Sequence, residues 1–378
     1  MKKILVLLLS LAIFFGVSGF SLAQEQSPSP EEAVNQEFTP KPSEFYLAKV
    51  SQMVEEGDKD LGQGVIQPFQ KVKLSILSGT EKGKEIEIDH GSLFSITAEQ
   101  KVKSGELVVV TKAFQPEGEI YYIADRFRLI NIAMVFMVIL ALWAILGRGK
   151  NMGMLVALLG SLVVAYKYLV PRLIASPTAM PVTIVSLLLI LGFIVFIGFG
   201  VSRKNTLIFI SSLITALLGF GMTYLLVSKT ALTGSGSQEA IFLQTGAVDA
   251  LGLKNLLIAG ISVGVLGIVA FVAKKQIEFV DMIKVDNKQL KGGKLVTKIL
   301  INSDNNISHY LAVVFLVIVG TSLPLIMLFG INKTVPFWVT FNSEFMMGEI
   351  IRLISTMGTI VLAVPVTTLT AYFLSAKK

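Results

Sequence analysis

The sequence contains no cysteine, only two histidines and few charged residues. Without cysteine the chain forms no disulfide, no thiolate metal site and no thiol nucleophile. Charged residues make up 16% of the chain and hydrophobic residues 53%, which is too little charge for an ordinary soluble surface. His90 and His309 have no metal-ligand companions in sequence, and no catalytic motif is present. We therefore expect no metal or cofactor, and we predict that the protein is not an enzyme.

Long apolar runs dominate the chain after residue 128. Each is long enough to cross a hydrocarbon core that needs about 20 apolar residues, and the seven runs cover residues 129–147, 152–170, 180–200, 206–227, 255–273, 310–331 and 349–375. The segments that connect them are alternately rich and poor in Lys and Arg. Because these residues mark the cytoplasmic side, every connection predicts the same topology. It has the N-terminal region outside, about seven transmembrane helices and the C-terminus inside.

The first 23 residues have the pattern of a signal peptide. Two lysines precede the apolar run 4–20, and the small residues of Ser21-Leu22-Ala23 suit a cleavage site. An uncleaved anchor is the alternative, and in both cases the chain from residue 24 lies outside. Residues 24–43 are rich in Pro, Ser and Glu, which predicts a disordered linker.

Residues 44–127 are predicted to form a small all-β extracytoplasmic domain. Its five short, partly alternating segments are 44–54, 67–77, 84–89, 106–112 and 119–125. Such a series indicates a small barrel or sandwich, and the OB barrel is one such form. Residues 24–127 hold 11 Lys and Arg against 18 Asp and Glu. Most of the basic excess lies in the connections after residue 128, so binding to nucleic acid is not expected.

The largest cytoplasmic connection covers residues 274–309 and holds seven lysines. Lysines beside a membrane attract anionic lipid, so we expect this loop to contact the bilayer surface. Ile277, Phe279, Val280 and Ile283 predict a short amphipathic helix that continues from the fifth run. The rest of residues 128–378 forms the predicted transmembrane domain.

Ionisable residues inside spans often mark function because their burial is expensive. No run carries a central Asp, Glu or His, which argues against a proton relay. Glu344, Glu349 and Arg352 lie at the outer end of the last run. Glu349 and Arg352 are three residues apart, so they share a helix face and can pair. The pair is either an interfacial anchor that fixes helix depth or a gate at the mouth of a pathway.

Prolines and hydroxyls accompany each other in the last two runs. Thr321 and Ser322 precede Pro324, and Thr367 follows Pro365. Proline frees a backbone carbonyl that a hydroxyl can help to satisfy. Broken helices of this kind line transport pathways, and simple packing kinks are the alternative. In the fifth run, small residues on nearly one face predict close helix packing; they are Gly260, Gly264 and Gly267.

Several sequence motifs together resemble those of the YibE/F-like family of bacterial multi-pass membrane proteins. They are Phe341-Asn342-Ser343-Glu344, Glu349-Ile350-Ile351-Arg352, Met357-Gly358, residues 361–367, residues 319–325, residues 264–267 and the turn 79–84. The resemblance covers most of residues 44–378 and is most specific from about residue 310. It implies a permease in the bacterial cytoplasmic, or inner, membrane. The family's Asp shortly after Gly267 is replaced here by Phe271-Val272-Ala273, so the substrate is expected to differ or to be absent.

Two functions therefore remain open. The first is a permease or export component for an unknown solute, with a pathway near the last two transmembrane helices. The second is a membrane scaffold or sensor that transports nothing and whose β domain binds a protein partner. Pro324 and Pro365 favour the first, and the lack of a central charge favours the second. A homo-oligomer is compatible with both.

Overall fold

The computed structural model describes residues 42–60, 66–115, 118–147, 152–175, 179–245, 252–287, 289, 292–331 and 335–375. The predicted signal peptide, residues 1–23, and residues 24–41 of the predicted linker lie outside these ranges. The chain divides into two compact units between Phe136 and Met137. Each unit is described by itself.

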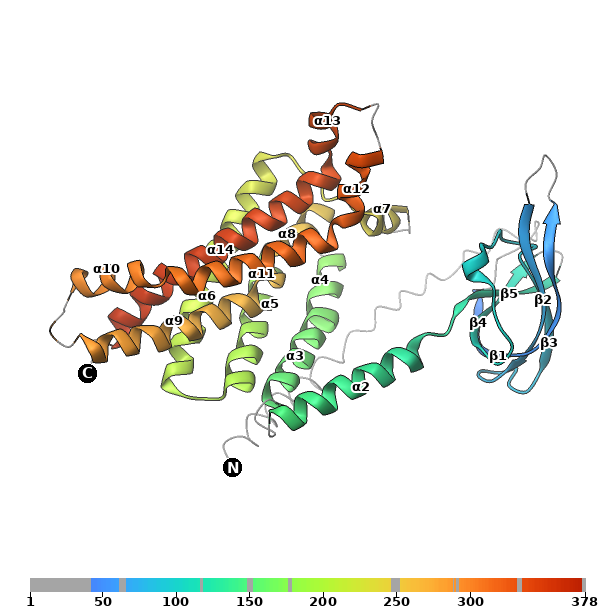
Figure 1. Cartoon of the computed structure of the whole chain (residues 1–378), viewed down its shortest axis with the longest axis horizontal. Coiled ribbons are helices and arrows are strands. Elements are labelled where there is room, and N and C mark those ends of the chain that lie inside the picture. The colour runs from blue at the N-terminus through green and yellow to red at the C-terminus, as the bar shows by residue number, and fades with distance from the viewer. Residues whose placement is uncertain are drawn as a thin grey trace, which may run out of the picture. The chain divides into compact units, whose positions relative to one another are not determined.

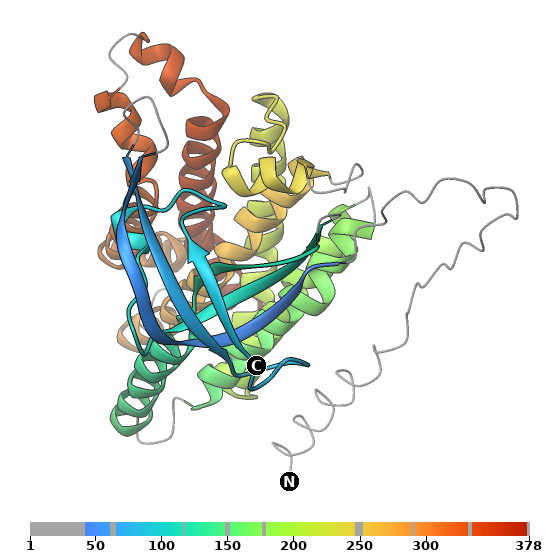
Figure 2. The ribbon, with the colours of Figure 1, turned by 90° about the vertical axis from the view of Figure 1, so that its right-hand side faces the viewer.

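The first unit contains a sheet of five antiparallel strands, as the alternating sequence predicts. The strands are β1 (Glu44–Asp60), β2 (Ile66–Ile76), β3 (Glu85–His90), β4 (Leu107–Gln115) and β5 (Gly118–Arg126). Their order is β3-β2-β1-β4-β5. The long strand β1 pairs with both β2 and β4, and its register shifts twice against β2. Such irregularities increase twist and bending, and Figure 2 shows the curved strands.

Alternation along the strands builds the core of this unit. Val72 and Leu74 on β2 and Val108 and Val110 on β4 are fully buried, two residues apart on each strand. Side chains two apart lie on the same face of a strand, so both pairs point inward. A short 3₁₀-helix, η1 (Ala98–Gln100), lies between β3 and β4.

Helices follow the sheet (Figure 1). They are α2 (Leu129–Leu146), α3 (Met152–Val164), η2 (Ala165–Leu169), α4 (Val170–Ala175), α5 (Ala179–Gly192), η3 (Phe193–Phe199), α6 (Arg203–Lys229), α7 (Gln238–Thr245), α8 (Leu253–Gly264), α9 (Leu266–Asp286), α10 (Gly293–Asn302), α11 (Asp304–Thr321), α12 (Leu323–Ile331), α13 (Phe337–Phe341) and α14 (Glu344–Ser375). The elements η2 and η3 are π-helical turns within longer helical segments.

Six helical segments in the described part of the chain are long and apolar enough to cross a membrane. They are Leu129–Leu146, Met152–Ile174, Met180–Phe199, Arg203–Lys229, Leu253–Asp286 and Glu344–Leu374. The predicted run 310–331 is divided between α11 and α12, and its apolar helix, Ile307–Thr321, is shorter than the six. The prediction of several membrane-spanning helices is confirmed.

The segment 274–309, predicted as a connection, is largely helical. The amphipathic continuation of the fifth run is confirmed, because α9 extends to Asp286 and buries Ile277 and Val280. Helix α10 follows, with Leu295 and Ile299 buried.

Helices α6, α9 and α14 pack against one another, and α11 packs against α14 (Figure 1). Helix α6 begins where the side chain of Ser202 accepts a hydrogen bond from the backbone of Asn205, at 3.1 Å. This is a standard N-cap. The core of the second unit joins residues of α5, α6, α9 and α14, among them Leu191, Val227 and Ala270. Helix α14, which carries Glu344, Glu349, Arg352 and Thr367, therefore belongs to this core.

Candidate functional site

Glu344, the first residue of α14, holds the loop that follows α6. Its Oε1 accepts hydrogen bonds from the backbone nitrogens of Thr233 (2.9 Å), Gly234 (2.7 Å) and Ser235 (3.1 Å), and from the Thr233 hydroxyl (2.7 Å). Gly234 has a φ of +87°, and an added Cβ would overlap the carbonyl of Leu253. A glycine is therefore required there. Glu344 has a structural role that its position alone did not predict.

Glu349 connects the two last predicted apolar runs, 310–331 and 349–375, through a hydrogen bond. The Arg352 Nη1 lies 3.1 Å from Glu349 Oε1, so the predicted ion pair is confirmed. The hydroxyl of Ser322, at the break between α11 and α12, donates to Glu349 Oε2 at 3.1 Å. Ser322 is buried. Three of the predicted site residues therefore meet at one place.

A cavity of about 170 Å³ opens beside these charges. Its walls come from the start of α14, from α8 and from residues 232–243, and Glu344, Glu349 and Arg352 all line it together with Glu239. Among the described residues, none of those that line it belongs to α11 or α12. The cavity thus lies between α14 and α8 and not between the last two predicted spans.

Helices α6 and α14 both carry buried hydroxyls. The buried members are Ser211, Ser212, Thr215 and Thr223 on α6 and Ser355, Thr356, Thr359, Thr367 and Thr368 on α14. Several donate to a carbonyl one turn earlier in their own helix: Thr215 to Ser211 (2.8 Å), Thr223 to Gly219 (2.9 Å) and Thr359 to Ser355 (2.6 Å). Such bonds are the usual arrangement for a hydroxyl within a helix.

Three of these hydroxyls are exceptions. Among the described residues, the side-chain oxygens of Ser212, Ser355 and Thr367 are buried without a hydrogen-bond partner. Leaving a buried hydroxyl unpaired costs about 1–3 kcal/mol. Thr367 was predicted from its position after Pro365, but Ser212 and Ser355 were not in the predicted site. A serine within an otherwise apolar helix was the sequence signal that could have identified Ser212 and Ser355.

A neutral polar cluster lies next to Thr367. The amide nitrogen of Gln276 on α9 donates to Ser303 Oγ (2.8 Å) and to Thr368 Oγ1 (2.9 Å). The Ser303 hydroxyl donates to the carbonyl of Ile299 at 2.7 Å. Gln276, Ser303 and Thr368 are all buried. The sequence did not predict this cluster, because Gln276 follows two lysines in a segment that was predicted to be a loop.

The remaining predicted hydroxyl and prolines do not join these groups. Thr321 is exposed and donates to the carbonyl of Ile318 at 2.9 Å. Pro324 is the second residue of α12, where its missing N–H would have no helical partner in any case. Helix α14 continues through Pro365, which is half-buried.

The glycines of the fifth run do not mediate close contacts in the described chain. A Cβ added at Gly260, Gly264 or Gly267 would meet no described atom within 4 Å. The close approach lies elsewhere, because a Cβ at Gly219 on α6 would overlap the side chain of Thr359 on α14. Close packing at a glycine is therefore found in the α6–α14 contact, and also where Gly160 on α3 meets Phe193.

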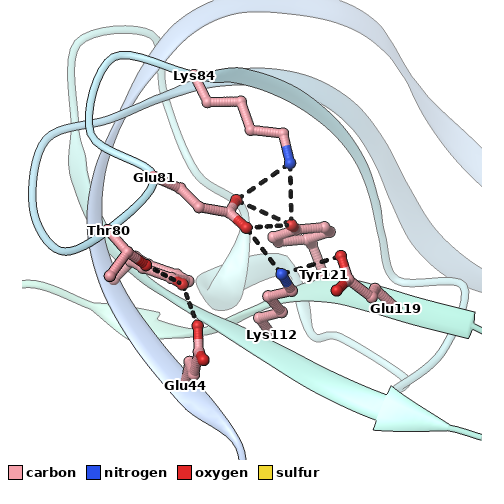
Figure 3. Close-up of polar contacts among 8 residues, drawn as sticks. Glu44, Thr80, Glu81, Lys84, Lys112, Glu119 and Tyr121 are labelled. Atoms are coloured by element: carbon pink, nitrogen blue, oxygen red, sulfur yellow. Dashed lines mark hydrogen bonds and ion pairs between the residues drawn. The ribbon is translucent and has the colours of Figure 1, made fainter.

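The turn 79–84 of the first unit holds an ionic cluster (Figure 3). Glu81 contacts Lys112 Nζ at 2.7 Å and Lys84 Nζ at 3.1 Å, and accepts from the Tyr121 hydroxyl at 2.9 Å. Lys112 also lies 2.9 Å from Glu119. The hydrogen bond from Lys112 is the main cause that lowers the pKa of Glu81 to about 2. These contacts fix the turn between β2 and β3 onto β4 and β5.

A second cavity, of about 370 Å³, lies in the first unit between the end of β3, the segment before β4 and β5. Phe94 is largely exposed there and meets Tyr122 edge-to-face at 5.1 Å between ring centroids. Arg126 and His90 also line the cavity, and burial lowers the pKa of His90. The combination of an exposed aromatic and charged groups suits the binding of a partner.

The long apolar helices define a multi-pass α-helical membrane protein. Residues 134–377 match the family described as YibE/F-like protein. Because this match covers more than half of the chain, the protein belongs to that family, and the resemblance stated from its motifs is confirmed. A search of curated proteins and a search of solved structures each gave no match.

Proposed function

We propose that this protein is a permease or export component whose pathway follows α14. The observation that carries the proposal is the set of buried side-chain hydroxyls on α6 and α14 that have no hydrogen-bond partner in the described chain, those of Ser212, Ser228, Ser355 and Thr367. A contact made only for packing is stabilised by Gly, Ala and apolar residues, or by hydroxyls that are paired. Unpaired hydroxyls suit a route in which water or a solute supplies the missing hydrogen bonds.

The cavity at the N-terminal end of α14 is the proposed outer mouth of this route. The ion pair of Glu349 with Arg352 lies within α14 and lines this mouth, and the bond from Ser322 connects Glu349 to the break between α11 and α12. The break at Ser322 between α11 and α12 resembles the interrupted helices of transporters. The sequence predicted a pathway near the last two transmembrane helices, whereas the proposed route lies along α14 beside α6 and α8.

The finer topology is also part of the proposal. Helices α11 and α12 together form the sixth of seven crossings, with the N-terminal unit outside and the C-terminus inside the bacterial cytoplasmic membrane. The Lys-rich connections support this orientation. On α10, Lys294 and Lys298 are exposed while Leu295 and Ile299 are buried, which suits contact with anionic lipid at the inner surface.

The N-terminal unit is proposed to be an exported OB-type barrel that follows a signal peptide. An OB barrel is a five-stranded, partly open Greek-key barrel. The order β3-β2-β1-β4-β5 and the long, irregular β1 paired on both sides support this assignment. We propose no enzymatic role, metal or cofactor for either unit.

Cysteine accessibility tests the pathway without knowledge of the substrate. The chain has no native cysteine, so single-cysteine variants need no altered background. Ser355→Cys and Ser212→Cys are expected to react with a water-soluble methanethiosulfonate reagent in membranes. Val361→Cys and Leu218→Cys are matched controls on the same helices. Their side chains are 47% and 48% exposed on the outside of the helical unit, where lipid would cover them, so both cysteines are expected to be protected from the reagent. Equal protection of all four cysteines would contradict the pathway.

The cavity of about 370 Å³ in the N-terminal unit favours the second function, a scaffold or sensor that binds a partner. Phe94, 62% exposed, would be its apolar anchor. The two functions differ in what removal of residues 44–126 does. If the cysteines of the pathway are unreactive and this truncation abolishes the cellular role of the protein, the scaffold function replaces the permease.

A further inference from the structure

The second membrane-spanning segment, Met152–Ile174, carries two cations near its C-terminal end. Lys167 lies on the π-helical turn η2, and Arg172 lies on α4. Both side chains are exposed, whereas their neighbours Leu169 and Leu173 are buried in a cluster with α8. The two cations therefore lie on the side of the helix that faces away from the packed core of the helical unit.

Two tyrosines accompany these cations. The Cζ of Arg172 lies 3.9 Å from the ring centroid of Tyr168, and the Nζ of Lys167 lies 5.2 Å from that of Tyr166. A cation this close to the face of an aromatic ring is attracted to it. An arginine stacked on a ring keeps the N–H groups at its edge available for hydrogen bonds. We call these four residues the span-end cluster.

The span-end cluster has no acidic partner in the described chain. Residues 126–238 contain no Asp or Glu, and no ion pair joins Lys167 or Arg172 to any described residue. A cation close to hydrocarbon is expensive unless its charge is compensated. The counter-charge is therefore expected to come from a molecule other than this part of the chain.

The depth of the cluster matches the layer of lipid headgroups. Arg172 lies two residues and Lys167 seven residues before the end of the segment at Ile174, which corresponds to about 3 and 10 Å along a helix. The headgroup layer on each side of a bilayer is about 5–7 Å thick, and a lysine can extend its ammonium group toward it. Tyrosine is also enriched at this boundary.

We propose that the span-end cluster binds the phosphate of an anionic phospholipid headgroup. The guanidinium group of Arg172 matches two phosphate oxygens, and Lys167 adds a second positive charge. Val170 and Ile174, 41% and 44% exposed, provide an apolar surface for the acyl chains. Turns such as η2 are frequent at functional sites. This inference is independent of the pathway, because the site uses none of the pathway residues.

Lipid quenching at a single reporter tests the site in the full-length protein. Because the chain has no cysteine, Val170→Cys can carry a bimane fluorophore between the two cations. The labelled protein is reconstituted in liposomes that contain brominated phosphatidylglycerol or brominated phosphatidylcholine. The anionic lipid is expected to be preferred about 25-fold, which corresponds to about fivefold for each cation. Quenching by phosphatidylcholine shows that the reporter contacts lipid in every variant.

Matched variants separate a defined site from general attraction to cations. Arg172→Gln and Lys167→Gln are each expected to lower the preference about fivefold. Tyr168→Leu keeps both charges and removes the stack, and should lower it about twofold. A reporter at Leu225→Cys, 59% exposed and one turn before the lone cation Lys229 of α6, is the control and should show only about a fivefold preference.

Several results would overturn the inference. Equal quenching of the Val170→Cys reporter by the two lipids would reject an anionic lipid. An unchanged preference in Tyr168→Leu, or equal preferences at positions 170 and 225, would show only diffuse attraction. Loss of the preference on addition of inorganic phosphate, but not of sodium chloride at the same ionic strength, would assign the cluster to a soluble anion.

Discussion

Glu81→Gln is expected to destabilise the N-terminal unit by about 1–2 kcal/mol at neutral pH. Contacts with Lys112, Lys84 and Tyr121 lower the pKa of Glu81 from 4.5 to about 2. At 1.36 kcal/mol for each pKa unit, that difference corresponds to at most about 3.4 kcal/mol. Lys84 and Glu119 of the cluster are half exposed, so solvent screens part of these charges, and glutamine keeps part of the hydrogen bonding. The expected loss is therefore about half of the upper limit.

The pH dependence follows from the sign of the shift. A carboxyl whose pKa is lower in the folded state stabilises the fold above its unfolded pKa, and this contribution disappears as the pH falls through the folded value. For Glu81 the contribution is complete above about pH 4.5 and lost toward pH 2. The difference in unfolding free energy between the native chain and Glu81→Gln should shrink over that range.

Residues 42–128 expressed alone provide the assay, because their strands pair with one another and enclose their own core. Urea unfolding followed by circular dichroism at pH 7 and pH 3 gives the free energies. Glu87→Gln is the matched control: its ion pair with Lys71, at 3.0 Å, is exposed on both sides and should contribute less than about 1 kcal/mol. A Glu81→Gln effect no larger than the control, or unchanged at pH 3, would refute the reasoning.

Three further outcomes are expected in the helical unit. Glu344→Gln should speed proteolysis of the loop after α6, because four hydrogen bonds lose their charged acceptor. A hydrogen bond to a charged group contributes at most about 1.5–3 kcal/mol. The control variant Glu239→Gln should not change the rate of proteolysis. Gly219→Val should lower the melting temperature of the purified protein by several degrees, because the added atoms overlap Thr359 on α14; Gly260→Val should leave it unchanged, and equal effects would contradict the close contact of Gly219 with Thr359. Asn287→Cys should be labelled by an impermeant reagent only after the membrane is opened, and labelling in intact cells would reverse the topology.

The sequence predicted the elements better than their contacts. Apolar length alone located the helices, and period-two alternation located the strands, because both depend on neighbouring residues. The run 310–331 was predicted as one span, and the structure divides it at Ser322. The motif Ser322-Leu323-Pro324 contained the signal, since proline begins a helix more readily than it continues one. The extension of α9 to Asp286 could also be predicted, because its apolar residues have amphipathic spacing.

The candidate site was predictable only where its residues are close in sequence. Glu349 and Arg352 are one helical turn apart, so spacing was enough to predict their pairing. The bond from Ser322 to Glu349 and those from the loop after α6 to Glu344 join different helices. The close contact of Gly219 with Thr359 likewise joins α6 to α14. Such contacts depend on packing angles and register that a single sequence does not specify.

The hydroxyl faces of α6 and α14 also bear on how the protein is made. Helix α6 ends at Lys229 and α14 begins at Glu344, so more than a hundred residues are synthesised between them. During that time the polar face of α6 lacks the helix that covers it, and lipid offers no partner to the unpaired hydroxyl of Ser212. The last helix is thus the one that completes the interior. A chain that stops before residue 344 would leave a polar stripe open to lipid or to membrane proteases, so assembly of this protein depends on its final segment.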